Sequence, residues 1–297
     1  MKFDSKKWLL AGALALGLAG LLALPPNVFA AQGQGQPPQG QPPAKPPATP
    51  ATPATQQQTA PTQPEAPKVD PQEEAAYKAF YETKNTDTDR QVQLGEDFLK
   101  AYPESRYRGT VYARLTQAYF NKQQMDKMFA AADKTLALNP DDVDVLALIG
   151  WVLPHNYNPN DLDADQKLNR SEQYLKHGIE LLTTLQKPAS LTDEEFAKSK
   201  DGKLSQCHSG LGLVYFRRGQ YADSVAELQQ STQLIPTPDP VDFYVMGIDF
   251  QQLKRFGEAA TAFERCSQIP SSLQGGCQQS MEQSKRLAAA EAAPPKH

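Results

Sequence analysis

The sequence is poor in cysteine, with 3 in 297 residues. Three thiols cannot build a disulfide-dense scaffold or a zinc site with four thiolate ligands. The chain also lacks an excess of positive charge, because 30 Lys and Arg stand against 34 Asp and Glu and give a net charge of −4. A dedicated nucleic-acid binder needs a basic surface to neutralise phosphates. We therefore expect no nucleic-acid partner.

The motifs of several enzyme classes are missing as well. The sequence has no Walker loop, no GxSxG elbow, no HExxH pair and no CxxC pair. The string Gly210-Leu211-Gly212 is not followed by the third glycine of a dinucleotide-binding turn. The histidines lie at no metal-ligand spacing and are scattered over His155, His177, His208 and His297. We expect no catalytic residue, no cofactor and no bound metal.

The one long apolar run lies near the N-terminus. Residues 8–24 are seventeen apolar or small residues without a charge, preceded by lysines at positions 2, 6 and 7. Val28 and Ala30 place small residues at the −3 and −1 positions of a cleavage site. This pattern predicts a signal peptide at residues 1–30 and an exported protein of the periplasm or the exterior. The alternative is an uncleaved inner-membrane anchor at residues 8–24, which would be the chain's contact with a membrane.

Residues 31–71 are rich in proline, glutamine, alanine and threonine. They hold twelve prolines, and Val69 is their one large apolar residue. A segment with so little apolar surface cannot offset the entropy of ordering, so we expect a disordered linker. Proline favours the polyproline II conformation, which would make the linker a semi-stiff spacer of at most about 120 Å. The alternative is that its proline pairs dock on an aromatic groove or on cell-wall polymer.

An internal repeat follows the linker. Each copy has a bulky residue at position 4, a Leu-Gly-like pair at 7 and 8, an aromatic at 11, small residues at 20 and 27, and a closing proline. The clearest copy carries His208, Leu211, Gly212, Tyr215, Ser224, Leu228, Ser231 and Pro236. The next copy carries Phe243, Met246, Gly247, Phe250, Ala259, Phe263, Cys266 and Pro270. An earlier copy carries Tyr112, Leu115, Tyr119, Met128, Thr135 and Pro140, with Thr116 where the others have glycine.

The spacing predicts pairs of helices. Positions 4, 7, 8 and 11 lie on one stripe of a first helix, and positions 20, 24 and 27 on one stripe of a second. Small residues at positions 8 and 20 let the two helix axes approach closely. The proline cannot continue a helix and ends the unit. One pair cannot bury its apolar stripe alone, whereas stacked pairs can.

The repeat resembles the tetratricopeptide repeat, and the resemblance covers most of residues 72–270. It implies an all-α fold: a right-handed tetratricopeptide superhelix, or α-solenoid, of about five helix pairs. A capping helix from about Leu273 to Ala290 would complete a domain at residues 72–290, followed by a disordered tail at 291–297. The string at residues 98–105, FLKAYPES, resembles the unit ends of exported bacterial tetratricopeptide proteins of envelope assembly.

Two units depart from the pattern. The first is weak and is marked by Tyr77 and Phe80 on one helix. The third begins at Val143, and its second helix is delayed by an insertion at residues 154–166. Before the fourth unit, Thr192 and Glu195 have the spacing of a capping box. They predict the start of a long helix that runs into Arg217.

An acidic string in the insertion has two interpretations. Asp161, Asp163, Asp165 and Glu172 have the spacing of positions 1, 3, 5 and 12 of a calcium loop. However, Gln166 stands where the turn of such a loop requires glycine. The other interpretation is that the acids cap a helix at residues 166–182 and complement its dipole. We prefer the second interpretation.

Two of the cysteines have the placement of a disulfide pair. Cys266 ends the last repeat helix, and Cys277 lies near the start of the capping helix after a short turn. Neighbouring antiparallel helices can bring such residues into range, and an exported protein meets oxidants. We expect a Cys266–Cys277 disulfide and a buried, unpaired Cys207. The alternative is that both are small residues at packing positions.

The resemblance also implies a binding groove, because the first helix of each tetratricopeptide pair lines the inner surface of the stack. The positions that project there and that we expect to bind a partner are Gln117, Phe120, Asn121, Trp151, Phe216, Arg217, Tyr244 and Gln251. Aromatic rings with amides and one cation suit an extended or helical peptide. The alternative for each aromatic is packing between repeats.

The resemblance and the predicted export together indicate a function. They imply a non-catalytic protein-binding scaffold of the bacterial cell envelope, with a protein or peptide ligand in the concave groove, in envelope assembly or secretion. The alternative is an exported enzyme or ligand receptor on a helical-repeat frame, linked to calcium through residues 161–172.

Overall fold

The computed structural model describes residues 70–293. These residues form helices joined by turns and include no strand. They divide into two compact units, with the boundary between Arg108 and Gly109. No helix of residues 70–293 combines the length and the apolar character that a membrane span requires. The predicted signal peptide, the linker before Asp70 and the last four residues lie outside the described part.

The first unit contains α1 (Pro71–Tyr81) and α2 (Thr88–Ala101). Asp70 caps α1 by accepting a hydrogen bond of 2.8 Å from the Gln72 backbone N–H, which suits the carboxylate of an N-cap. Phe80 and Phe98 are buried between the helices. The ring of Tyr77 stacks on that of Tyr107, with centroids 3.9 Å apart. The weak first repeat is therefore a genuine helix pair held together by aromatic side chains.

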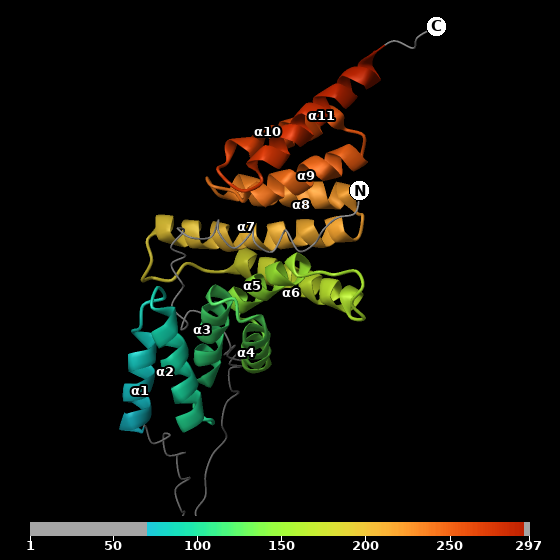
Figure 1. Cartoon of the computed structure of the whole chain (residues 1–297). Helices are drawn as coiled ribbons and strands as arrows, with labels where there is room; N and C mark the ends of the chain where they lie inside the picture. Colours follow the sequence, from blue (N-terminus) through green and yellow to red (C-terminus); the bar gives the residue numbers. More distant parts are fainter. Residues whose placement is uncertain (1–69, 294–297) are drawn as a thin grey trace, which may run out of the picture. The chain divides into compact units, whose positions relative to one another are not determined.

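The second unit continues the series of helices (Figure 1). They are α3 (Arg108–Asn121), α4 (Met125–Leu138), α5 (Val143–His155), α6 (Ala164–Thr184), α7 (Asp193–Arg217), α8 (Tyr221–Leu234), α9 (Pro240–Gln252), α10 (Phe256–Gln268) and α11 (Gln274–Ala292). Within this unit α4 packs on α5, α6 on α7 and α8 on α9, and the first helices α5, α7 and α9 also touch one another in turn. Within residues 70–293 the result is five helix pairs and one terminal helix, as the repeat predicts.

Three of the pairs share one close contact. In each, the glycine at position 8 faces the bulky residue at position 24, so that an added β-carbon would collide with it. The pairs of residues are Gly150 with Leu175, Gly212 with Leu228, and Gly247 with Phe263, where the distance from that β-carbon to the facing side chain would be 2.5, 2.5 and 2.6 Å. The glycine therefore sets how closely the two helices approach.

Serine at position 20 adds a hydrogen bond to this contact. The Ser171 hydroxyl donates to the Gly150 carbonyl at 2.6 Å. The Ser224 hydroxyl donates to the Gly212 carbonyl at 2.8 Å. Both serines are fully buried, and a buried hydroxyl is costly unless it finds such a partner. The small residue at position 20 thus both permits the contact and bonds across it.

The long helix α7 begins as the sequence predicts. The Thr192 hydroxyl accepts from the Glu195 backbone N–H at 3.2 Å, and the Glu195 carboxylate accepts from the Thr192 backbone N–H at 2.9 Å. This reciprocal pair is a complete capping box. The helix then continues for 25 residues to Arg217. The start of α7 is therefore set by the local capping box and not by a position of the repeat.

The terminal helix α11 is fastened to α10 by a disulfide between Cys266 and Cys277, whose Cα atoms lie 5.8 Å apart. This confirms the predicted pairing. Cys207 is free and fully buried, and burial raises the pKa of its thiol to about 12. Helix α11 runs to Ala292, two residues beyond the expected end of the domain.

Candidate protein-binding surface

Half of the predicted binding residues gather in one place. Phe120, Trp151 and Arg217 lie together with two residues that the repeat does not point to, His155 and Tyr157. Phe216 joins them through its neighbour Arg217, while its ring also packs against Tyr221 and the core of α8 to α10. We call these six residues the aromatic patch. They come from the ends of α3, α5 and α7 and from the turn between α5 and α6.

Trp151 is the centre of the aromatic patch. The edge of its ring system meets Phe120, with centroids 6.2 Å apart and an interplanar angle of 83°. Its other side lies against His155, at a centroid distance of 4.0 Å. Trp151 keeps 9% of its surface exposed. The Trp151 side chain therefore mainly packs against the neighbouring rings, and little of it projects from the surface.

His155 is fixed by a hydrogen bond to the same tryptophan residue. Its Nδ1 lies 2.7 Å from the Trp151 carbonyl oxygen, and because a carbonyl can only accept, Nδ1 carries the proton. Burial lowers the pKa of His155 to about 4, with Arg217 contributing. The imidazole is therefore neutral at pH 7, and the charge of the aromatic patch resides on Arg217.

Arg217 lies between two rings. Its guanidinium carbon is 5.8 Å from the ring centres of both Tyr157 and Phe216, within cation–π range. Its Nε donates to the Pro154 carbonyl at 3.3 Å. Arg217 forms no ion pair with any residue between 70 and 293, and burial lowers the pKa of its side chain. Its Nη donors thus have no carboxylate partner among residues 70–293.

The other predicted residues lie elsewhere. Gln117 donates to Asn121 at 3.0 Å on the exposed side of α3. The ring of Tyr244 packs on Phe263, with centroids 5.6 Å apart. Gln251 donates to the Ser284 hydroxyl of α11 at 2.8 Å. The amide of Gln251 is therefore engaged by the terminal helix.

His155 and Tyr157 could not be identified from the repeat. His155 lies one helical turn after Trp151, which was a usable signal. Tyr157 belongs to the insertion, where no repeat position applies. The insertion is what brings its ring to Arg217.

The acidic string of the insertion does not fit a calcium site. Lys167 Nζ lies 2.8 Å from Asp161 and 2.9 Å from Asp163, so a cation of the chain itself lies between these acids. Glu172 is bound by Lys176 at 2.6 Å and by Arg218 at 2.5 Å. Among residues 70–293 no group of three or more His, Cys, Asp or Glu could hold a metal.

The predicted helix cap is also different from the observed one. Helix α6 begins at Ala164, so Asp163 occupies the N-cap position, but its side chain makes no capping hydrogen bond. Its carboxylate is turned to Lys167 instead. Asp163 therefore makes no capping hydrogen bond, because the nearby ammonium group competes for its carboxylate. Asp165 lies in the first turn of α6, where its charge complements the helix dipole.

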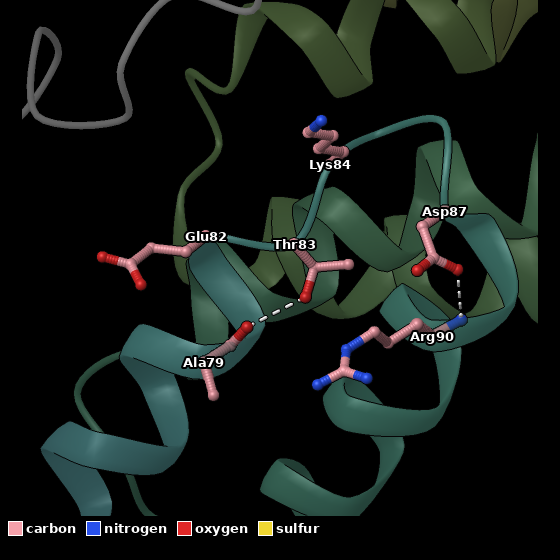
Figure 2. A pocket seen from close by; sticks show the side chains of 6 residues that line it. All are labelled: Ala79, Glu82, Thr83, Lys84, Asp87 and Arg90. Carbon is pink, nitrogen blue, oxygen red and sulfur yellow. Dashed lines mark hydrogen bonds between the residues drawn. The ribbon is translucent and has the colours of Figure 1, made fainter.

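A shallow recess lies at the turn between α1 and α2 (Figure 2). Its lining residues are Ala79, Glu82, Thr83, Lys84, Asp87 and Arg90. The Thr83 hydroxyl donates to the Ala79 carbonyl at 2.9 Å, and the Arg90 backbone N–H donates to Asp87 at 3.4 Å. These contacts complete the helix ends, and the Glu82 and Lys84 side chains point away from each other. The recess offers no arrangement of groups for catalysis.

Several solved structures resemble the chain. A structure of MamA has 16% sequence identity and a TM-score of 0.48, covering 67% of this chain and 98% of that chain. PilW, described as a widely conserved type IV pilus biogenesis factor, has 14% identity and a TM-score of 0.46, covering 75% and 94%. A thermophilic TPR protein of Thermus thermophilus has 16% identity and a TM-score of 0.38, covering 74% and 100%. No protein-family model and no curated protein matches the chain.

The contacts inside the helix pairs decide the fold. Glycine at position 8 faces the bulky residue at position 24, and serine at position 20 bonds to the glycine carbonyl. The chain has the tetratricopeptide-repeat fold. In a tetratricopeptide stack the first helices of successive pairs lie side by side, as α5, α7 and α9 do here. The aromatic patch lies on these first helices and on the turn that follows α5.

Proposed function

We propose that the chain is a non-catalytic protein-binding scaffold of the bacterial cell envelope that captures a partner segment on the aromatic patch. The observation that carries the proposal is the set of rings around Arg217, which come from α3, α5 and α7 and from the inserted turn. Such a surface suits a peptide, because aromatic residues and arginine are the commonest anchors of binding energy. The location in the envelope rests on the predicted signal peptide, and a role in envelope assembly or secretion on the likeness of the repeat ends.

The donors of the aromatic patch support binding rather than internal structure. The Trp151 indole N–H forms no hydrogen bond with any residue between 70 and 293, and the Nη groups of Arg217 are equally without partners there. A bound peptide would supply carbonyl acceptors for both. Gln251 would extend the contact only if α11 shifts, because its amide donates to Ser284 of that helix, and the ring of Tyr244 is engaged by Phe263 of α10.

Affinity capture from envelope extract tests the proposal. The full chain would be compared with Phe216→Ala and Arg217→Gln, two changes at half-buried positions of the aromatic patch. Leu138→Ala is the matched control, because Leu138 is an apolar residue of the second helix α4 with 44% of its surface exposed. We expect partners that the wild type and the control retain and that both patch variants lose. Equal recovery by all four proteins would reject the aromatic patch as the binding site.

A further inference from the structure

One buried position of the repeat holds a carboxylic acid where the other copies hold small apolar residues. This is position 10, two residues after the glycine position on the first helix of each pair. In the four repeats that follow Arg108 its residues are Ala118, Val152, Val214 and Asp249, with exposed fractions of 0%, 1%, 0% and 0%. Charged side chains are almost never fully buried unless they are paired. Packing alone therefore does not account for Asp249 on α9.

No cation compensates the carboxyl of Asp249. Among residues 70–293, neither of its oxygens has a hydrogen-bond partner, and no charged side chain contributes to its pKa. The charged groups of the helices around it are paired with one another, packed against rings or exposed. The paired groups are His208 with Glu227, Arg218 with Glu172, Arg255 with Glu258, and Lys285 with Glu282; Arg217 lies against Tyr157 and Phe216; Asp239 and Asp242 at the start of α9 act on each other; and Asp223, Lys254, Glu264 and Arg265 are exposed.

The hydroxyl of Ser224 is the polar group beside Asp249. It acts on the pKa of the carboxyl and opposes the rise that burial causes. This hydroxyl donates to the Gly212 carbonyl at 2.8 Å. A serine hydroxyl has one proton to donate, and an ionised carboxylate can only accept. The Gly212 carbonyl of α7 and an ionised Asp249 of α9 therefore compete for the single hydroxyl proton of Ser224 in α8.

Protonation of Asp249 removes this competition. A protonated carboxyl has an O–H that can donate to the Ser224 oxygen while Ser224 keeps its bond to Gly212. One chain of hydrogen bonds then joins α9, α8 and α7. When Asp249 is ionised, either its charge or the Gly212 carbonyl lacks a donor in a buried place, which is costly unless water reaches it. Burial accordingly raises the pKa of Asp249 to about 7.

The preceding pair gives a comparison within the chain. Ser171 of α6 donates to the Gly150 carbonyl at 2.6 Å, in the same way as Ser224 donates to Gly212. The first helix that follows, α7, has the buried Val214 at position 10. The helices α5, α6 and α7 therefore have the serine bond without a titratable residue at position 10.

We propose that Asp249 makes the contact between α8 and α9 a proton-controlled joint, which is closed while its carboxyl is protonated and opens when it ionises. Opening releases α9, α10 and α11 together, because α9 packs on α10 and the Cys266–Cys277 disulfide holds α11 to α10. The inference goes beyond the proposed function, since it does not depend on the aromatic patch. It gives the helices that carry the predicted groove residues Tyr244 and Gln251 a response to pH near neutrality.

Hydrogen exchange of the full chain at about pH 6 and pH 8 tests the proposal, after correction for the intrinsic effect of pH on exchange. A carboxyl with a folded pKa of about 7 should raise the equilibrium constant of opening about tenfold between these pH values. Terminal pairs of a repeat protein lose protection when they separate from their neighbour. We expect that loss in α9 to α11, and none of comparable size in α5 and α6.

Two variants assign the effect to Asp249 and not to Asp242, which lies on the same helix and is also buried. Asp249→Val supplies the residue that stands at Val152 and Val214. It should make the pH effect on opening about tenfold smaller than in the wild type. Asp249→Asn, whose amide can donate to Ser224 as the protonated acid does, should do the same. Asp223→Asn, at an exposed position of α8, is the control and should keep the wild-type response.

Three results of this experiment would overturn the proposal. The first is equal protection of α9 to α11 at both pH values in the wild type. The second is an unchanged pH effect in both Asp249 variants, which would assign it to Asp242. The third is an equal loss of protection in all helices after Arg108, which would mean that the whole unit opens and not one joint.

Carbon-13 NMR of the aspartate carboxyls gives an independent measurement. The signal that disappears in Asp249→Asn belongs to Asp249, and it should titrate with a midpoint of about 7. A midpoint near the ordinary aspartate value of about 3.9 would show that the folded chain accommodates the charge and would contradict the proposal.

Discussion

At the scale of single residues, the packing of the tetratricopeptide pairs depends on glycine at position 8 as much as on the bulky residue at position 24. Gly212 lets Leu228 approach the backbone of α7, and the carbonyl of Gly212 accepts from Ser224. Thr116 replaces this glycine in the second repeat, where its hydroxyl donates to the Tyr112 carbonyl of its own helix at 2.9 Å. In this pair, α3 and α4, the residue at position 24 is the small Ala132 in place of leucine or phenylalanine.

Gly212→Ala should destabilise the protein by about 1–3 kcal/mol, because overpacking forces the facing side chain and backbone apart. The new β-carbon would lie 2.5 Å from Leu228 Cγ. Gly257→Ala is the control, since nothing lies within 4 Å of a β-carbon there, and it should be neutral or stabilising by up to about 1 kcal/mol. Urea unfolding followed by circular dichroism measures both. Equal stability of the two variants would refute the packing rule.

Trp151→Ala should lower the free energy of unfolding of the compact unit that follows Arg108, besides any effect on binding. Removing a large buried aromatic costs about 3–5 kcal/mol, and Trp151 is only 9% exposed. Phe216→Ala, at a half-buried position, should cost about 1–2 kcal/mol and is the better probe of partner capture. Thermal unfolding separates the two effects. A Trp151→Ala protein with wild-type stability would show that the indole is not part of the core.

At the scale of elements, the insertion before α6 and the terminal helix α11 make contacts that the regular repeat does not predict. The insertion before α6 places Tyr157 beside Arg217. The terminal helix α11 covers the end of the stack, where Cys277 and Ser284 are its buried residues. Ser284 accepts from Gln251 at 2.8 Å, so α11 also covers a predicted binding position on α9.

Reduction of the Cys266–Cys277 disulfide should loosen α11. The bridge closes a loop with a sequence separation of 11, and a loop of this size contributes about 2–3 kcal/mol. Hydrogen exchange should show lost protection over residues 274–292, with the amides of α5 to α8 unchanged. Cys207→Ala keeps the bridge, so its α11 should respond to reductant as the wild type does. Recovery of the protein from an oxidising compartment with three free thiols would contradict the bridge.

At the scale of the whole molecule, stability depends on several buried ionisable groups. Burial raises the pKa of Asp242 to about 7, with Asp239 adding to the effect and the hydroxyls of Ser231 and Ser209 opposing it. Burial also raises the pKa of Asp249 to about 7, and the nearby Ser224 hydroxyl opposes the rise. That hydroxyl donates to the Gly212 carbonyl, so neither carboxylate oxygen of Asp249 has a hydrogen-bond partner within residues 70–293. Both carboxyls therefore bind a proton more tightly in the folded state than in the unfolded chain.

The free energy of unfolding should therefore rise as the pH falls from 7.5 to about 5. A carboxyl whose folded pKa is raised from 3.8 to about 7 costs stability as it ionises, and this loss develops between those two pH values. Asp142, raised to about 6, acts in the same direction. His155 opposes them, because its pKa is lowered to about 4 and its neutral form stabilises the fold above pH 6.5. Because the raised carboxyls, which include Asp239, outnumber the single imidazole, we expect a net gain in the free energy of unfolding over this pH range.

Asp249→Asn isolates one of these groups. Removal of a buried charge without a partner should stabilise the protein at pH 7.5 by about 1–2 kcal/mol and reduce its pH dependence. Asp223→Asn, at an exposed position of α8, is the control and should leave the pH profile unchanged. Denaturant titrations at pH 5 and 7.5 measure both. An Asp249→Asn protein that is less stable at pH 7.5 would mean that the carboxylate has a stabilising role.

The sequence by itself determined the helix pairs, the capping box of Thr192 and Glu195, and the disulfide between Cys266 and Cys277. These depend on spacing within about thirty residues, where helix geometry fixes which side chains share a face. Only the tertiary structure decided that Trp151 is largely buried, that His155 and Tyr157 join Phe216 and Arg217, and that Lys167 lies between the acids of the insertion. Those outcomes depend on which separate helices meet and on competition among neighbouring charges. Neither can be read from the spacing of residues along the chain.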